Sequence, residues 1–342
     1  MLRAALRDLQ WRWKRFVIAM IGVALVFAMG LIMTALTASF SLETGRTLHA
    51  IGAERWAVAA DASGPFTSSS LIPTSTATDS GGSPVMVLRE TITTGSKVRD
   101  IIMMGVEQGQ LGSPNVKRGD GLAAAGQVVV DASLPNVDIG DDISIGGKDF
   151  QVVGETSHQS LFAGIPLVYV SLADAQNVAV LGQPLATTLL FDHVPTFVSR
   201  DLKVLTNAEV KADVLRPLTA ARSSIGFVRL LLWLVAAIVI GSVLYLQALE
   251  RTRDFAVFKA TGTSTAAIGA GLALQAVMLS LAAAVLAAIL ATFLAPLFPL
   301  HVEIPTSAYL LLPVITVVVG LLACSIALRR TARVDPALAF GG

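Results

Sequence analysis

Hydrophobic positions in this chain are concentrated in four long runs, and one large polar block separates the first run from the other three. The first run, 16–42, opens with 24 uncharged residues, Phe16–Ser39. As an α-helix they would span about 36 Å, against about 30 Å for the hydrocarbon core of a bilayer. The later runs are 223–248, 266–297 and 309–328. This pattern predicts a membrane protein with four transmembrane α-helices.

A cleaved signal peptide is the alternative interpretation of the first run. The apolar core of a signal peptide is about 7–15 residues long, so 24 uncharged residues favour a retained helix. The preceding segment, 1–15, contains five basic residues, and it also contains Trp11 and Trp13. Such a mixture is typical of an amphipathic segment at the headgroup level of a membrane.

The polar block, 43–222, predicts one folded domain of mixed α+β type between the first and second transmembrane helices. Its clearest local signal is Gly146-Gly147, which joins two β-type runs as a two-residue hairpin. By contrast, 61–84 predicts a mobile loop, because 17 of its 24 residues are Ser, Thr, Gly or Pro.

Other elements of this domain follow from short apolar runs and a capping signal. Ser171, with Asp174 three residues later, predicts the start of a helix at Leu172–Leu181. A second helix is expected at Ala208–Leu215. Strands are expected at Trp56–Ala60, Val85–Thr91, Val98–Val106, Gln127–Asp131, Ile143–Ile145, Lys148–Val153, Leu167–Val170 and Thr187–Phe191.

Composition excludes several classes of protein. The chain is 54% hydrophobic and 14% charged, whereas soluble domains carry about 25% charged residues. A net charge of +1 gives no reason to expect a nucleic-acid partner. The single cysteine, Cys324, lies in an apolar run, so we expect no intrachain disulfide.

No catalytic chemistry is apparent in the sequence. The four histidines are scattered, no nucleophile motif frames a serine, and no ligand spacing indicates a metal site. The phosphate-binding pattern G-x-x-x-x-G-K-[ST] does not occur. We therefore expect a protein that is not an enzyme and has no catalytic cofactor, with any ATP hydrolysis in a separate subunit.

The distribution of basic residues predicts the orientation in the membrane. Segments 1–15, 249–265 and 329–342 together hold 11 Lys and Arg residues, whereas the short loop 298–308 holds none. By the positive-inside rule, both termini are expected in the cytoplasm and the large domain outside the cell membrane.

Segment 249–265, between the second and third helices, is charged and amphipathic. Phe255 and Phe258 are three residues apart, which suits a short helix lying at a membrane surface. Gly262 can end that helix, and Ser264 can cap the next one. The charged residues around the two phenylalanines are Glu250, Arg251, Arg253, Asp254 and Lys259.

The string LERTRDFAVFKATGTS resembles the signature of the FtsX/MacB-type ABC permeases, E-R-x-R-E-I-x-x-L-K-A-x-G-A-S. This chain has Asp254 for the usual acid, Phe255 and Phe258 for aliphatic residues, and Thr263 for alanine. The tail RRTARVDPALAFGG is similar to the family ending R-x-A-R-x-D-P-x-x-A-L, with Arg330, Asp335 and Pro336 in matching places. Among family members the chain resembles the small four-helix permeases, which include Gram-positive heme exporter permeases.

The resemblance implies a homodimeric permease that works in the lipid membrane with two copies of a cytoplasmic ATPase. Segment 249–265 would be the coupling helix that touches the ATPase, through its two phenylalanines and its charged residues. The first and second membrane helices would form the central dimer interface. Efflux of a hydrophobic or amphipathic molecule from the outer leaflet is then the expected activity.

Heme is the specific substrate suggested by a group of residues near the outer end of the first helix. Met29 and Met33 are one helical turn apart, and Glu43 and Arg46 follow. Thioethers or a carboxylate could bind the iron, and Arg46 or Arg229 could meet the propionates. Alternatively, the methionines face lipid or fill gaps between helices, and Arg229 extends to the membrane surface. Lipid or lipoprotein extraction, and signalling without transport, are further alternatives.

Overall fold

The computed structural model describes residues 13–94, 97–196, 199–250, 252, 257, 261–298 and 303–332. The chain divides into two compact units, each with its own core. One unit is Ser39–Ala220. The other unit is made of the residues up to Ala38 together with those from Ala221 onwards. These limits compare with 43–222 for the domain expected from the sequence.

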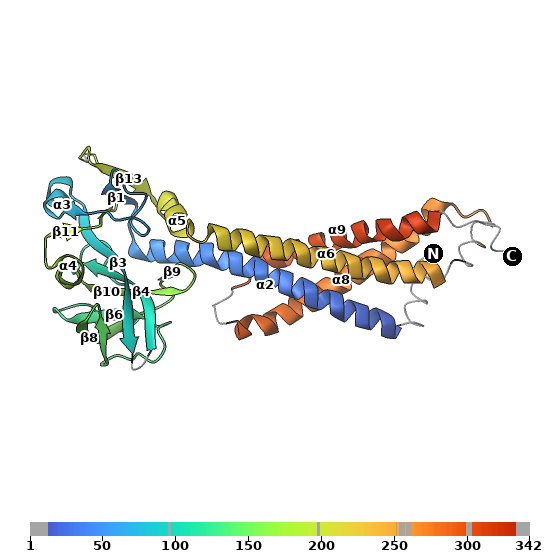
Figure 1. Ribbon diagram of the computed structural model, residues 1–342, viewed down its shortest axis with the longest axis horizontal. Coiled ribbons are helices and arrows are strands. Elements are labelled where there is room, and N and C mark those ends of the chain that lie inside the picture. Colours follow the sequence, from blue (N-terminus) through green and yellow to red (C-terminus); the bar gives the residue numbers. More distant parts are fainter. Residues whose placement is uncertain are drawn as a thin grey trace. The chain divides into compact units, whose positions relative to one another are not determined.

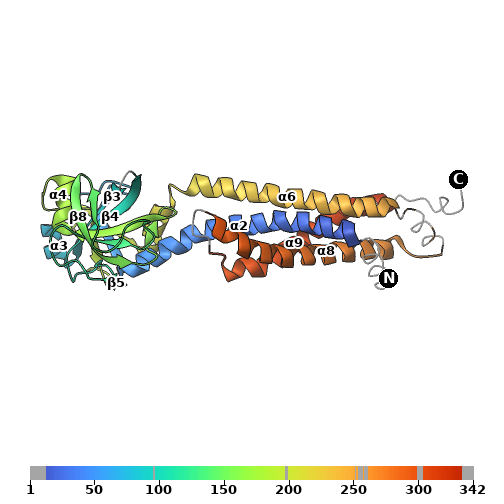
Figure 2. The same ribbon diagram turned by 90° about the horizontal axis from the view of Figure 1, so that it is seen from below.

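The helical unit is built from four long helices, which Figures 1 and 2 show lying alongside one another. Each contains a stretch long and apolar enough to cross a membrane. Three of these helices extend several residues beyond the expected spans, since α2 continues to Ile51, α6 begins at Thr219, and α9 covers Thr306–Ala332. The elements are α2 (Trp13–Ile51), α6 (Thr219–Glu250), α8 (Thr265–Leu294), the 3₁₀ turn η1 (Ala295–Leu297) and α9 (Thr306–Ala332).

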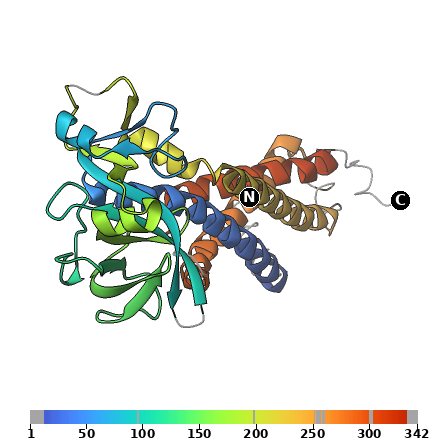
Figure 3. The same ribbon diagram turned by 60° about the vertical axis from the view of Figure 1, so that its left-hand side comes forward.

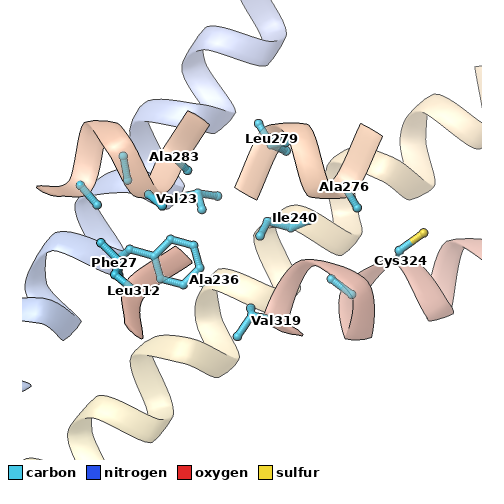
Figure 4. Packing of buried hydrophobic residues seen from close by; sticks show 14 of the residues in the cluster. Val23, Phe27, Ala236, Ile240, Ala276, Leu279, Ala283, Leu312, Val319 and Cys324 are labelled. Atoms are coloured by element: carbon cyan, nitrogen blue, oxygen red, sulfur yellow. The ribbon is translucent and has the colours of Figure 1, made fainter. Parts of the chain in front are cut away.

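Small side chains dominate the core of the helical unit (Figure 4). Ala236 of α6 and Ala276 and Ala283 of α8 are fully buried there. The tightest approach is at Gly320 of α9, where an added Cβ would lie 2.1 Å from Oγ of Ser280. Such residues let membrane helices pack closely without large side chains between them.

The second unit is an α+β domain of strands and short helices (Figure 3). Its strands form one large sheet in the order β13-β1-β12-β3-β4-β10-β6-β8-β5. Strand β7 lies off this path and pairs with both β3 and β8. The six strands β3, β4, β10, β6, β8 and β7 therefore close into a ring. A separate two-stranded sheet pairs β11 with β2.

The strands of the large sheet are β1 (Arg55–Ala59), β3 (Ser83–Thr94), β4 (Lys97–Val106), β5 (Arg118–Gly119), β6 (Gln127–Asp131), β7 (Asp142–Ile145), β8 (Lys148–Thr156), β9 (Ser160–Leu161), β10 (Ile165–Ser171), β12 (Thr188–Phe191) and β13 (Leu202–Thr206). The small sheet contains β2 (Ile72–Pro73) and β11 (Leu185–Ala186). The short helices of the domain are α3 (Ser75–Ser80), α4 (Leu172–Val180) and α5 (Asn207–Leu215).

Alternation along the strands buries both faces of the central sheet. In β4, Ile101 and Met103 enter one apolar cluster, while Ile102 and Met104 enter another. Because successive side chains on a strand point to opposite faces, an unbroken apolar run is expected for a strand covered on both sides. Helix α4 packs closely over β4, and a Cβ added at Gly105 would lie 2.2 Å from that of Ala175.

Several local predictions are confirmed. The Gly146-Gly147 turn joins β7 to β8 with Ile145 paired to Lys148, and both glycines have positive φ, 56° and 79°. Two such residues in sequence are the requirement of a type I′ hairpin. Ser171 caps α4, where its side chain accepts a hydrogen bond from the backbone N–H of Asp174.

The prediction of a structureless loop at 61–84 is wrong. The segment contains α3, and its strand β2 pairs with β11. Two of its hydroxyl groups, those of Thr67 and Ser63, donate hydrogen bonds to the fully buried carboxylate of Asp213 in α5. Arg216 also pairs with that carboxylate at 3.4 Å. The Ser- and Thr-rich composition of the segment gives no indication of the Asp213 carboxylate, which lies far away in the sequence.

Candidate functional site

Arg229 is the one charged residue in the four predicted spans, and the structure holds it between α6 and α2. Its Nη1 donates a hydrogen bond to Oγ1 of Thr34 at 3.3 Å. Its guanidinium carbon lies 5.4 Å from the ring centroid of Trp233, one turn further along α6. Its Nε is buried and has no hydrogen-bond partner in the described part of the chain.

The α2 side of this contact is formed by small residues. Thr34 donates a hydrogen bond to the carbonyl of Gly30 at 2.8 Å, which leaves its oxygen free to accept from Arg229. Gly30 makes room for the indole, since a Cβ there would lie 3.3 Å from Nε1 of Trp233. The sequence-based prediction did not include Gly30, Thr34 or Trp233, although an arginine four residues before a tryptophan on one helix is a recognisable signal.

Met29 and Met33 lie on the adjoining face of α2. At 100° per residue, they are separated by about 40° around the helix, and Gly30 and Thr34 follow about 100° further round. Met29 is 39% exposed and Met33 is half-buried. Arg229 contacts Thr34, and the two methionines lie on the next face of the same helix, so a shared site for the three residues stays a prediction.

Glu43 does not belong to this group. It lies ten residues beyond Met33 on α2, about 15 Å along a continuous helix, on turns that cluster with the α+β domain. Its carboxylate accepts a hydrogen bond from Oγ of Ser160 in β9. Glu43 and the methionines are therefore separated along α2, and a role for either as a ligand of the heme iron stays a prediction. Arg46 is exposed one turn further along.

A buried polar network surrounds the Glu43 contact. Asp131 of β6 is fully buried and accepts hydrogen bonds from the N–H of Gln159 at 2.8 Å and from Oγ1 of Thr156 at 3.2 Å. The hydroxyl of Tyr169 donates to Oε1 of Gln159. Burial, with a smaller effect of the Asp131 charge, raises the pKa of Glu43 to about 7 and moves that of Tyr169 above its ordinary value. Part of the Glu43 carboxyl population is thus protonated at neutral pH, unlike an exposed glutamate.

Comparison with known proteins decides the family. Residues 226–336 match the FtsX-like permease C-terminal family. The chain is also 41% identical, over 349 residues and the full length of both proteins, to an uncharacterized ABC transporter permease of Mycobacterium tuberculosis strain H37Rv. A second such permease of that strain is 38% identical over 353 residues, again at full length. The chain belongs to the FtsX/MacB-type ABC transporter permeases.

Two solved structures resemble part of this permease. The periplasmic region of MacB from Actinobacillus actinomycetemcomitans aligns with a TM-score of 0.36 and 14% identity, covering 48% of the permease and 94% of that chain. The extracellular domain of the ABC-type transporter YknZ from Gram-positive bacteria aligns with a TM-score of 0.28 and 14% identity, covering 36% of the permease and 75% of that chain.

Membership of the family establishes the general role of the molecule. The permease is a multi-pass membrane protein with an extracellular α+β domain between its first two membrane helices. As an ABC transporter permease, it has an ATPase subunit as its partner.

Most of the segment expected to contact that ATPase lies outside the described residues. Arg251, Arg253, Asp254, Phe255, Phe258 and Lys259 all fall there. At its two ends the structure is informative. Glu250 is the last residue of α6, and Gly262 has a φ of 91°, which only glycine adopts easily. Ser264 caps α8, as expected, by accepting a hydrogen bond from the N–H of Ala267.

Proposed function

We propose that this permease exports an amphipathic molecule from the outer leaflet of the cell membrane, driven by ATP hydrolysis in its partner subunit. The observation that carries the proposal is the position of Arg229. It puts one polar anchor between α2 and α6 beside exposed apolar side chains. A molecule with a polar group and an apolar body matches such a surface.

The proposal includes a homodimer with two ATPase copies and cytoplasmic termini, and exposed apolar surface on α6 supports the homodimer. Only a narrow stripe of α6 is buried within the chain, through Ala236, Ile240, Gly241, Leu244 and Ala248. The remaining faces are apolar and exposed, as at Leu230 and Ile238. Surface of this kind suits lipid and a second permease copy.

Heme is the specific substrate that we propose. Met29 and Met33 offer soft thioether ligands for iron, and Arg229 offers a cation for a propionate. Glu43 has no part in this version of the site, because Ser160 engages its carboxylate.

The test is an absorption titration of the purified permease–ATPase complex with hemin, together with its ATPase rate. We expect a saturable Soret shift and hemin-stimulated hydrolysis, both lost in Met29→Ala and Met33→Ala. Met20→Ala, on the same helix, is the matched control and should retain both, as should Glu43→Ala. A flat titration would remove heme as the substrate and leave the family assignment untouched.

Signalling without transport is the second candidate, and one contact favours it. Thr47 of α2 and Ser160 of β9 exchange hydrogen bonds, so the outer end of a membrane helix is fastened to the extracellular sheet. Movement of α2 would then reach the domain mechanically. Extraction of a lipid or lipoprotein uses the same contacts and is a variant of the export proposal.

A further inference from the structure

Arg229 carries a charge that nothing in the described part of the chain neutralises. Arginine stays protonated in proteins at all accessible pH values. Charged residues inside membrane spans are costly, and they are usually paired or directed to a functional site. No carboxylate among the described residues forms an ion pair with Arg229, and the four predicted spans contain no acidic residue. The guanidinium therefore needs an anion from elsewhere.

The side chain is held in place instead of reaching freely towards water. It lies over the ring of Trp233 and donates to Thr34, while its Nε is buried without an acceptor. Thr34 is a neutral hydroxyl and cannot balance the charge. A guanidinium has five N–H donors, and the hydrogen bond to Thr34 leaves several of them for a ligand. Trp233 is in turn seated against Gly30, so the arginine is presented on a rigid support.

The surroundings define what kind of anion fits. The neighbouring residues Phe227, Leu230 and Leu234 of α6 are apolar and exposed, as is Met29 of α2. A free inorganic anion would gain nothing from such a surface, whereas an amphipath could lay its apolar part along it. Arginine binds carboxylate and phosphate groups through two parallel hydrogen bonds, which suits a planar or tetrahedral headgroup.

We propose that Arg229, supported by Trp233 and Thr34, is the binding site for the anionic headgroup, a carboxylate or phosphate, of an amphipathic molecule in the membrane. This deepens the export proposal by giving the chemical class of the substrate, and it rests on that proposal only for calling the bound molecule a substrate. Besides the propionates of heme, membrane phospholipid and a free fatty-acid-like molecule are sources of such a headgroup.

Trp233 provides the readout, because brominated acyl chains quench the fluorescence of nearby indoles. The experiment uses the full-length permease in phosphatidylcholine nanodiscs, with Trp11→Phe and Trp13→Phe to remove the other indoles near the membrane. Trp56 remains and is fully buried in the extracellular domain. Brominated phosphatidylglycerol, brominated stearate and brominated phosphatidylcholine are added in separate series.

We expect half-maximal quenching of Trp233 at an about tenfold lower mole fraction of the anionic probe than of the zwitterionic one, corresponding to one charge-assisted hydrogen-bonded pair. Arg229→Gln should abolish this preference, and Arg229→Lys should keep only part of it, because lysine lacks the planar fork. Arg222→Gln, which removes a positive charge near the start of the same helix, is the matched control and should keep the full preference. A preference for phosphatidylglycerol, stearate or both identifies the source.

Equal quenching by anionic and zwitterionic probes in the parent protein would overturn the inference, and so would an anionic preference that survives Arg229→Gln. If Arg229→Gln does not fold, Thr34→Val replaces it and should weaken the preference severalfold, since it removes only the hydrogen bond to the guanidinium. A full preference for anionic probes in Thr34→Val would then contradict the proposed site.

The ATPase rate of the purified permease–ATPase complex distinguishes this inference from the export proposal. Arg229-dependent anion preference without any stimulation of ATP hydrolysis would support the site and contradict export. Hydrolysis stimulated equally by neutral amphipaths in the parent and in Arg229→Gln would support export and contradict the anionic substrate class.

Discussion

Thr47 and Ser160 illustrate how single side chains connect a membrane helix to the extracellular domain. Oγ1 of Thr47 donates to the carbonyl of Ser160 at 2.8 Å and accepts from its N–H at 3.1 Å. Both residues are buried, so the hydroxyl serves as the partner of two backbone groups that water cannot reach. Backbone groups in such positions are costly to leave unpaired.

Replacing Thr47 with valine should therefore destabilise the protein. The change keeps the shape of the side chain but removes both hydrogen bonds, and we expect a loss of about 2–4 kcal/mol of unfolding free energy. Thermal unfolding of the detergent-solubilised protein measures it as a lower Tm.

Thr37→Val is the matched control on the same helix. Thr37 donates only to the carbonyl of Met33 within its own helix, so its loss should change the Tm little. Equal effects of the two variants would contradict a special role for the contact between Thr47 and Ser160.

At this scale, sequence reasoning found what depends on close neighbours. Ser171 and Ser264 were identified as helix caps because the partner of a cap is only three residues away. Arg229 is recognisable in the sequence as the one charged residue of the predicted spans. Thr34 is not, because its contact with Arg229 joins residues 195 positions apart. No local pattern encodes such a pair.

The close packing of helices α8 and α9 depends on a glycine, which has no side chain. Gly320 faces Ser280, and a methyl group there would meet its Oγ at 2.1 Å and its Cβ at 3.3 Å. Ser280 is fully buried, and its Oγ has no hydrogen-bond partner among the described residues. The hydroxyl therefore occupies the space that the glycine leaves.

We expect Gly320→Ala to lower the Tm through overpacking, by about 1–3 kcal/mol of stability. The double variant Gly320→Ala/Ser280→Ala should recover part of this loss, because the colliding hydroxyl is removed. Ser280→Ala alone is the control and should be close to neutral. Additive effects of the two changes in a double-mutant cycle would contradict the direct contact.

Elements with strong local signals were predicted well, and those defined by distant partners were not. The Gly146-Gly147 hairpin and strand β6 required only their own residues. The first membrane helix was predicted to end at residue 42, whereas α2 ends at Ile51. Its last turns are polar in sequence, yet they bury Leu48 and Ile51 in the extracellular domain. The structure of segment 61–84 could not be predicted, because Ser63 and Thr67 bond to Asp213 and no residue near the segment in the sequence indicates this partner.

For the whole molecule, alternating long apolar and polar blocks was enough to predict four membrane helices and one domain between the first two. The sheet order was beyond reach, because β1 pairs with strands that follow it by more than a hundred residues. The family assignment came from the segment 249–265, and full-length relatives support it.

Coupling to the ATPase is a property of the assembled complex. We expect Phe258→Asp to leave membrane insertion intact while ATP hydrolysis no longer drives function, because a charge would replace the apolar contact with the partner that the family resemblance implies. Substrate-stimulated ATPase activity in reconstituted complexes measures the effect, expected as a loss of at least tenfold.

Phe258→Leu restores the aliphatic residue found in the family signature and serves as its control, with activity retained. Normal stimulation in Phe258→Asp would show that this position does not contact the ATPase.

The position of β1 in the sheet has a consequence for how the protein is made. Its neighbours are β12 and β13, which end at Phe191 and Thr206. Because the extracellular domain emerges from the membrane with its N-terminal residues first, β1 stays without partners until nearly the whole domain has been translocated. The sheet can be completed only shortly before α6 enters the bilayer. Maturation of the domain is thereby tied to insertion of the second membrane helix, and a chain truncated before β13 would leave an apolar strand exposed on the cell surface.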